Sequence, residues 1–129
     1  MGAFNEENNV ALLAIVTVDH SAAAQTTLFI VPSGFRLAGI DKVDIEAAGD
    51  EADTDITIGQ VGALTDYIGT TQLDNLDAQY DSVTVKPIQA DPPVKKKSYA
   101  AGTVIQVDVT AANGNAGNTY FLFGTLKPE

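Results

Sequence analysis

The chain contains no cysteine and no tryptophan, and its only histidine is His20. The lack of cysteine excludes disulfides, thiolate metal sites and cysteine nucleophiles, and it fits assembly in a reducing cytoplasm. One histidine without cysteine cannot supply a transition-metal site, so we expect no metal and no other cofactor. Basic residues are also scarce. Seven bases against 17 acids give a formal charge of −10, which repels phosphate backbones and argues against nucleic-acid binding.

Long hydrophobic runs are missing as well. The apolar run at residues 10–16 is far shorter than the ~18 residues of a membrane span, so we expect no membrane partner. It follows Glu6 and Glu7, where a secretory signal would carry bases. We therefore interpret residues 10–18 as a β-strand.

The length of 129 residues suits one domain, since ~100–200 residues per domain is usual. Residues 1–9 are polar and rich in asparagine, including Asn8 and Asn9, around a single aromatic residue, Phe4. This composition predicts an N-terminal arm outside the core. Residues 10–129 are then the single folded domain.

Alternating apolar and polar residues between turn signals predict eight or nine short strands. They are placed at residues 10–18, 26–31, 35–46, 55–61, 64–68, 82–88, 103–111 and 119–126. Residues 103–111 and 119–126 are expected to form a terminal hairpin across an Asn- and Gly-rich turn. The parity of the apolar residues changes around Gly39, which predicts a β-bulge.

The spacing of Leu73 and Leu76 predicts one short helix or helical turn near residues 71–79. Elsewhere the pattern is β throughout, and aspartate outnumbers glutamate by 12 to 5, as turn-rich chains favour. The predicted fold class is all-β, an antiparallel β-sandwich or barrel.

The negative charge is concentrated in one stretch. Residues 41–81 hold eleven acids and one base, whereas the rest of the chain is balanced. One interpretation is a solvated acidic face, and a second is an end that faces solvent while the remainder packs on a partner. A third is a calcium site in residues 50–55, although the glycine and terminal glutamate of an EF-hand are missing.

No residue pattern indicates an enzyme. His20 follows Asp19 at a strand end, and we expect it in a surface loop. The four serines lack a nucleophile context, and no glycine-rich phosphate loop is present. Carboxylates are abundant but form no specific pair, and a glycosidase cleft would want aromatic platforms.

Two groups of residues are candidates for contacts with a partner. Lys95, Lys96 and Lys97 form the only basic cluster, either protecting a strand edge or meeting an acidic neighbour, such as another copy. Phe121 and Phe123 share one face of the last strand, and its other face is apolar too. Such a strand is either central and covered on both sides or part of a subunit interface. We favour the interface, and hence an oligomer.

Two segments carry a family resemblance. Residues 27–37 read strand, Pro-Ser-Gly-Phe turn, strand, and residues 102–111 are followed by the aromatic end Tyr-Phe-Leu-Phe-Gly-Thr-Leu at residues 120–126. Both resemble segments of small β-sandwich proteins of tailed bacteriophages, the capsid cement (decoration) proteins, and the second resembles their terminal strands. The resemblance implies a jelly-roll fold and a homotrimer. It also implies binding to the major capsid protein on the outer surface of the virion.

On this hypothesis the chain stabilises contacts between capsid subunits, and the arm with Phe4, Asn8 and Asn9 orders on binding. The resemblance does not identify which residues touch the capsid. The alternative is a carbohydrate-binding β-sandwich module or a part of a phage head or tail fibre. Sugars would stack on exposed aromatics, and the candidates are Tyr67, Tyr80 and Tyr99.

Overall fold

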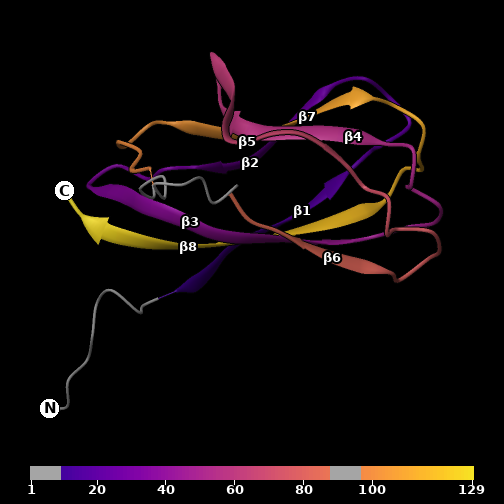
Figure 1. The fold of residues 1–129 in the computed structure, drawn as a ribbon. Coiled ribbons are helices and arrows are strands. Elements are labelled where there is room, and N and C mark those ends of the chain that lie inside the picture. Colours follow the sequence, from indigo (N-terminus) through magenta and orange to yellow (C-terminus); the bar gives the residue numbers. More distant parts are fainter. Residues whose placement is uncertain (1–9, 88–96) are drawn as a thin grey trace, which may run out of the picture.

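A computed structural model describes residues 10–87 and 97–129, and all regular structure in these ranges is β-strand (Figure 1). The strands are β1 (Ala11–Val18), β2 (Gln25–Ile30), β3 (Phe35–Glu46), β4 (Asp55–Gln60), β5 (Ala63–Gln72), β6 (Ser82–Val85), β7 (Val104–Ala111) and β8 (Asn118–Pro128). No helix capable of crossing a membrane occurs in the described ranges.

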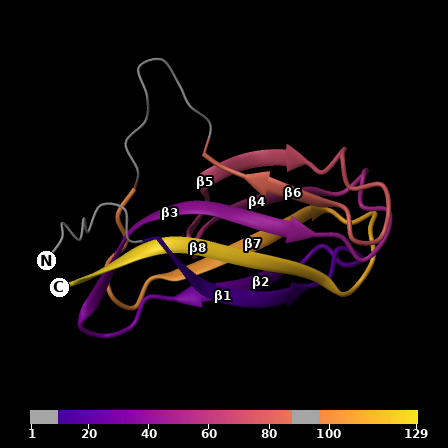
Figure 2. The same cartoon turned by 90° about the horizontal axis from the view of Figure 1, so that it is seen from below.

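The eight strands form two antiparallel four-stranded sheets with the orders β1-β8-β3-β6 and β2-β7-β4-β5. The two sheets lie over one another as layers (Figures 1 and 2). Strands that follow each other in the chain lie in opposite sheets, except for the β4–β5 hairpin. This is the strand order of a jelly roll, and the predicted antiparallel β-sandwich is confirmed.

The core lies between the sheets because inward-facing side chains alternate with outward-facing ones along each strand. In β7, Ile105, Val107 and Val109 are buried, and in β8, Tyr120 and Leu122 are buried. The sequence pattern of residues 103–111 thus predicted its buried face correctly.

The predicted bulge at Gly39 is present. The pairing of β3 with β8 shifts register between Leu37 and Gly39, and the φ of Gly39 is 150°. The extra residue keeps both Leu37 and Ile40 in the core, on either side of the irregularity.

The predicted terminal hairpin is wrong. β7 pairs with β2 and β4 in one sheet, whereas β8 pairs with β1 and β3 in the other. Residues 112–117 therefore cross from one sheet to the other. The Asn- and Gly-rich segment was a correct turn signal, but a turn of this length can join two layers as well as two neighbouring strands.

Of the predicted short helix or helical turn near residues 71–79, the helix is absent and turns are present. Thr71 and Gln72 belong to β5, and residues 73–80 form turns in which the Leu76 N–H donates to the Leu73 carbonyl at 3.1 Å. Leu73 and Leu76 are both buried, so their spacing reflects a turn that folds back onto the core. In so short a segment, apolar residues three positions apart are compatible with a helix and equally with such a turn.

This packing predicts that truncating Leu76 destabilises the fold although it lies outside every strand. We expect Leu76→Ala to lower the free energy of unfolding by about 2–5 kcal/mol, as for buried leucines in general. Val61, at 59% exposure in the turn between β4 and β5, is the exposed control, and Val61→Ala should cost below about 1 kcal/mol. Urea denaturation measures both, and equal losses would contradict the buried turn.

Candidate functional site

Four connections meet at one end of the sandwich, the right-hand end in Figure 1, and we call this the acidic end. They are residues 19–24, 47–54, 73–81 and 112–117. Together they hold seven acidic residues and no lysine or arginine. The acidic stretch seen in the sequence is thus mostly gathered at one end of the molecule.

His20 lies inside this end, and the expectation of a surface histidine was wrong. Its side chain has no exposed area. The Nδ1 atom is 3.0 Å from Oε1 of Glu51, and the Nε2 atom is 2.7 Å from the hydroxyl of Tyr120. The ring also meets the Tyr120 ring edge-on, with 5.7 Å between centroids. Its loop position suggested exposure, but the partners come from segments 31 and 100 residues away.

Glu51 connects all four segments of the acidic end. Its carboxyl oxygens accept hydrogen bonds from His20 in the first segment and from the backbone and side-chain N–H groups of Asn115 in the last, at 2.8 and 2.6 Å. Its own N–H donates to the Leu76 carbonyl at 2.7 Å, in the third segment. A buried carboxyl with three donors avoids the large penalty of an unpaired one.

Gly114 is required for this packing. A Cβ atom there would lie 2.4 Å from Oε1 of Glu51, 2.7 Å from Oγ1 of Thr54 and 2.8 Å from Cβ of His20. Any side chain would therefore displace the Glu51–His20 pair. The glycine allows the last connection to close over the two side chains.

The hydrogen-bond partners fix the protonation of His20. Burial lowers the pKa of His20 below its ordinary value of 6.5, and the hydrogen bond to Glu51 opposes that shift. Burial also raises the pKa of the Tyr120 hydroxyl, so this group stays protonated and donates to Nε2. A neutral ring with its proton on Nδ1 satisfies both partners, whereas a second proton on Nε2 would displace the Tyr120 donor.

This arrangement ties loops together and does not present a reactive group. Neither His20 nor Glu51 exposes any side-chain surface, so neither can reach a substrate from solvent. The calcium hypothesis for residues 50–55 also loses a ligand, because Glu51 points into the protein. In the part of the chain that the structure covers, no three acidic or histidine side chains are grouped to hold a metal ion.

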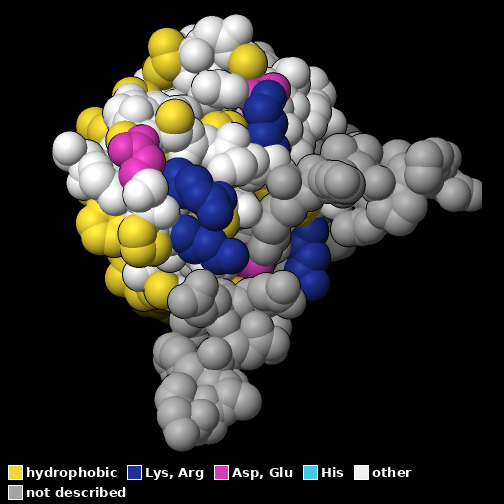
Figure 3. All heavy atoms as spheres, turned by 90° about the vertical axis from the view of Figure 1, so that its left-hand side faces the viewer, with side chains coloured by type: hydrophobic (Ala, Val, Ile, Leu, Met, Phe, Trp, Pro, Cys, Tyr) yellow, Lys and Arg dark blue, Asp and Glu magenta, His cyan; other side chains and the backbone are white. Residues whose placement is uncertain are grey.

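At the opposite end of the sandwich, basic side chains predominate among the described residues. Among the described residues, its connections hold Lys86 and Lys97, and Arg36 and Lys127 are direct register partners on β3 and β8. Like charges on opposed positions destabilise a sheet, so this pair is not explained by stability. Figure 3 views this end and shows several dark blue Lys and Arg side chains with few acidic ones. The charges of the described residues are therefore separated along the strands, with acids at one end and bases at the other.

The candidate contact residues predicted from the sequence are only partly placed. Phe4, Asn8, Asn9, Lys95 and Lys96 lie outside the described residues. Lys97 is described, and its Nζ atom is 2.7 Å from Oδ2 of Asp66 while about half of its side chain is exposed. That hydrogen bond lowers the pKa of Asp66.

Phe121 and Phe123 lie half-buried on the outer face of β8, which is a central strand. Their register partners on β1 are Ile15 and Leu12. On the other flank, the Nζ atom of Lys42 lies 4.6 Å from the centre of the Phe123 ring and 3.2 Å from Asp44. The apolar surface therefore ends at β3 and continues toward β1.

β1 and β2 are the outermost strands of their sheets and lie next to each other. We call the surface formed by the outer edges of these two strands and by their exposed side chains the side wall. It exposes Leu12 at 46%, Ile15 at 59% and Ile30 at 57%. Sequence reasoning placed these strands but missed their exposure. The available signal was that residues 10–16 are apolar without alternation, which requires a cover on both faces.

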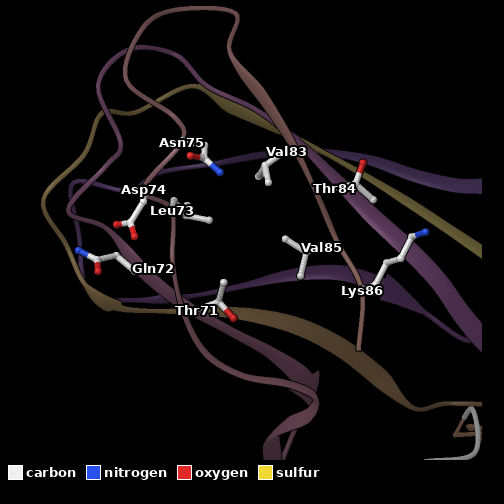
Figure 4. Close-up of a pocket in the computed structure, with 9 residues that line it drawn as sticks. All are labelled: Thr71, Gln72, Leu73, Asp74, Asn75, Val83, Thr84, Val85 and Lys86. Atoms are coloured by element: carbon white, nitrogen blue, oxygen red, sulfur yellow. The ribbon is translucent and has the colours of Figure 1, made fainter. Parts of the chain in front are cut away.

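A shallow groove of about 330 Å³ lies on the opposite side of the sandwich, between the end of β5 and β6 (Figure 4). Leu73, Val83 and Val85 line it together with polar side chains that include Gln72 and Lys86. None of the described residues that line this groove is aromatic, so they offer no stacking platform for a sugar.

The tyrosines proposed to stack sugars are mostly unsuitable. Tyr67 and Tyr99 are buried, at 8% and 3% exposure, and burial raises the pKa of Tyr99 to about 12. Only Tyr80 is exposed, on the acidic end, with a positive φ of 72°. A single exposed ring is a weak platform for stacking a sugar.

The fold is similar to chains in two bacteriophage capsid structures. One is described as the acidic stable capsid structure of Helicobacter pylori bacteriophage KHP30, with a TM-score of 0.60, 17% identity, and coverage of 93% of this chain and 89% of that one. The other is the cyanophage Pam1 capsid asymmetric unit, with a TM-score of 0.51, 15% identity, and coverage of 97% and 99%. At these identities the likeness establishes a shared fold. No protein-family model and no curated protein sequence matches the chain.

The buried His20 predicts a specific pH dependence of stability. Because its pKa is lower in the folded state than in the unfolded state, the folded protein binds fewer protons below about pH 6.5. The free energy of unfolding should therefore fall as the pH drops from about 7.5 to about 5, by at most ~1.4 kcal/mol per pH unit from this group.

The His20→Gln variant should lose this part of the slope, because glutamine cannot titrate in this pH range while its amide can still hydrogen-bond in place of the ring. Urea denaturation at each pH measures the difference in slope. As the only histidine, His20 also gives one assignable imidazole signal by NMR, whose titration midpoint should lie below 6.5. A midpoint at or above that value would contradict the assignment.

Proposed function

We propose that this chain is a non-enzymatic structural protein of a bacteriophage virion, and that it acts as a capsid cement protein. In this role it binds the outer surface of the capsid as a homotrimer and stabilises contacts between neighbouring major capsid subunits. The observation that carries the proposal is the jelly-roll likeness to chains of two phage capsid structures, which extends over 93% and 97% of this chain. A likeness along nearly the whole chain supports a common architecture better than a local match would.

The surface chemistry supports an adhesive role. At the acidic end the His20 and Glu51 side chains are fully buried, so neither is available there as a reactive group. The exposed features are an apolar side wall, a basic end and an acidic end. Adhesion by an oligomer is effective because several weak contacts made together multiply in strength.

The charge also fits a protein that is stored unassembled and then docks. A net charge of −10 per chain keeps separate oligomers apart in the cytoplasm in which they are made. With one end acidic and the other basic, a docked molecule can turn one end to solvent and the other to its partner.

The first test is whether the chain is part of virions. Virions purified on density gradients should contain it at a fixed copy number per major capsid subunit, measured by quantitative mass spectrometry. Virions stripped of the chain should lose heat resistance, and adding the purified chain back should restore it. A chain found only in the soluble fraction of infected cells would contradict the proposal.

The second test concerns the arm predicted at residues 1–9. We propose that Phe4, Asn8 and Asn9 contribute to capsid binding and that the sandwich folds without them. Deleting residues 1–9 should then leave the melting temperature unchanged while rebinding to stripped virions weakens. A more local test is Phe4→Ala in the full chain, which should also weaken rebinding to stripped virions. A large fall in melting temperature on deletion would assign the segment to the core instead.

A further inference from the structure

The side wall has an unusual composition for this chain. β1 and β2 together contain no charged residue, whereas the chain as a whole has 17 acids and seven bases. The strands at the other edge of the sandwich differ, since β5 contains Asp66 and β6 is followed by Lys86. The side wall is thus an uncharged strip on a strongly acidic molecule.

Both strand edges of the side wall are unpaired within the described residues. Among the described strands, β1 pairs with β8 alone and β2 with β7 alone. Exposed edges of monomeric proteins are normally protected by lysines, prolines, β-bulges or very short strands. β1 has eight residues with neither lysine nor proline. Its one protective feature of this kind is the irregular pairing between Leu12 and Ala14.

The side wall is also apolar where it is exposed. Ile15 and Leu12 project from β1 beside Phe121 and Phe123 of β8, and Ile30 projects from the end of β2. Leaving such side chains in water costs free energy that burial would recover. An unpaired edge with a continuous apolar surface predicts a cover in the assembled protein.

We propose that a second copy of this chain covers the side wall, so that the protomers of the proposed oligomer meet along β1 and β2. This inference rests on the oligomer in the proposed function and names its contact surface. The charges favour a second copy as the occupant. Two molecules of charge −10 repel wherever their acidic surfaces approach, and the side wall lets them touch with no charged side chain of either strand in the contact.

The dimensions are compatible with a stable contact. An eight-residue strand spans about 27 Å, and the two layers with the outer face of β8 give a width of ~20–25 Å. The resulting surface is on the order of 600 Å² per copy. A standard interface buries ~800 Å² per partner, so the side wall supplies most of it.

The decisive variant is Ile15→Lys, with Val61→Lys as its matched control. Both residues are 59% exposed, and Val61 lies in the β4–β5 turn, away from the side wall. Each variant changes the net charge by the same amount. Sedimentation equilibrium should show association weakened at least about tenfold for Ile15→Lys and unchanged for Val61→Lys. Equal effects, or a wild-type protein that is monomeric at micromolar concentration, would overturn the proposal.

A milder variant guards against a failure to fold. Ile15→Thr keeps the β-branched side chain that a strand favours and removes part of the apolar surface. At concentrations low enough for both proteins to be monomeric, this variant should melt at the same temperature as the wild type. At higher concentrations its association should be weakened in the same direction as that of Ile15→Lys. A variant that melts normally and associates like the wild type would contradict the assignment of this surface.

Salt separates this contact from an electrostatic one. If the side wall is the contact, raising NaCl from about 0.05 M to about 0.5 M screens the repulsion between copies and should tighten association. If instead the lysines at residues 95–97 met the acidic end of another copy, the same change would weaken association. Weaker association at high salt would therefore overturn the proposal.

Rebinding to stripped virions distinguishes this inference from the proposed function. If Ile15→Lys associates normally but no longer binds virions, the side wall contacts the capsid, and the inference fails while the cement role stands. If Ile15→Lys is monomeric where the wild type associates, and the wild type binds no virions, the contact between copies stands and the cement role fails.

Discussion

The buried carboxyl group of Glu51 is the interaction on which the rest of the structure depends. A jelly roll is held together mainly by its core, but its loops cross between layers and need fixing at the ends. Here one carboxyl accepts hydrogen bonds from His20 and Asn115, while its backbone N–H binds the turn at Leu76. The low dielectric of the buried site strengthens these hydrogen bonds. Breaking one would leave a buried polar group unpaired, which is very unfavourable. Gly114 is the local condition for this closure, since no side chain fits there.

Once the ends are fixed, the differences between the surfaces of the sandwich become meaningful. One end is acidic, the other carries Arg36 and Lys127 side by side, and the side wall is uncharged and apolar. Surfaces that merely keep a protein soluble would mix both charges. Segregation of charge, of apolar area and of unpaired strand edges onto separate faces is typical of a subunit with separate neighbours on each face. This is the physical basis for the proposal that the chain belongs to an assembly.

The sequence predicted what depends on local pattern and missed what depends on distant partners. β3 was placed at residues 35–46 as observed, and the bulge at Gly39 followed from a parity change that only neighbouring residues determine. The hairpin of residues 103–111 and 119–126 was wrong because a turn signal does not say which sheet the next strand joins. His20 was misplaced because Glu51 and Tyr120 are remote in the chain. The aromatic face of β8 was recognised, whereas its continuation onto β1 required the register.

The separation of charge along the strands makes the molecule an electric dipole as well as an anion. A uniformly charged sphere approaches a surface in random orientation, whereas a dipole experiences a torque in the field of that surface. At physiological salt the field decays within ~8 Å, so the torque acts only over the last stretch of the approach. There it biases which pole arrives first, before any specific contact is made. In the proposed docking, a protein with this charge distribution makes fewer unproductive collisions because it turns as it approaches.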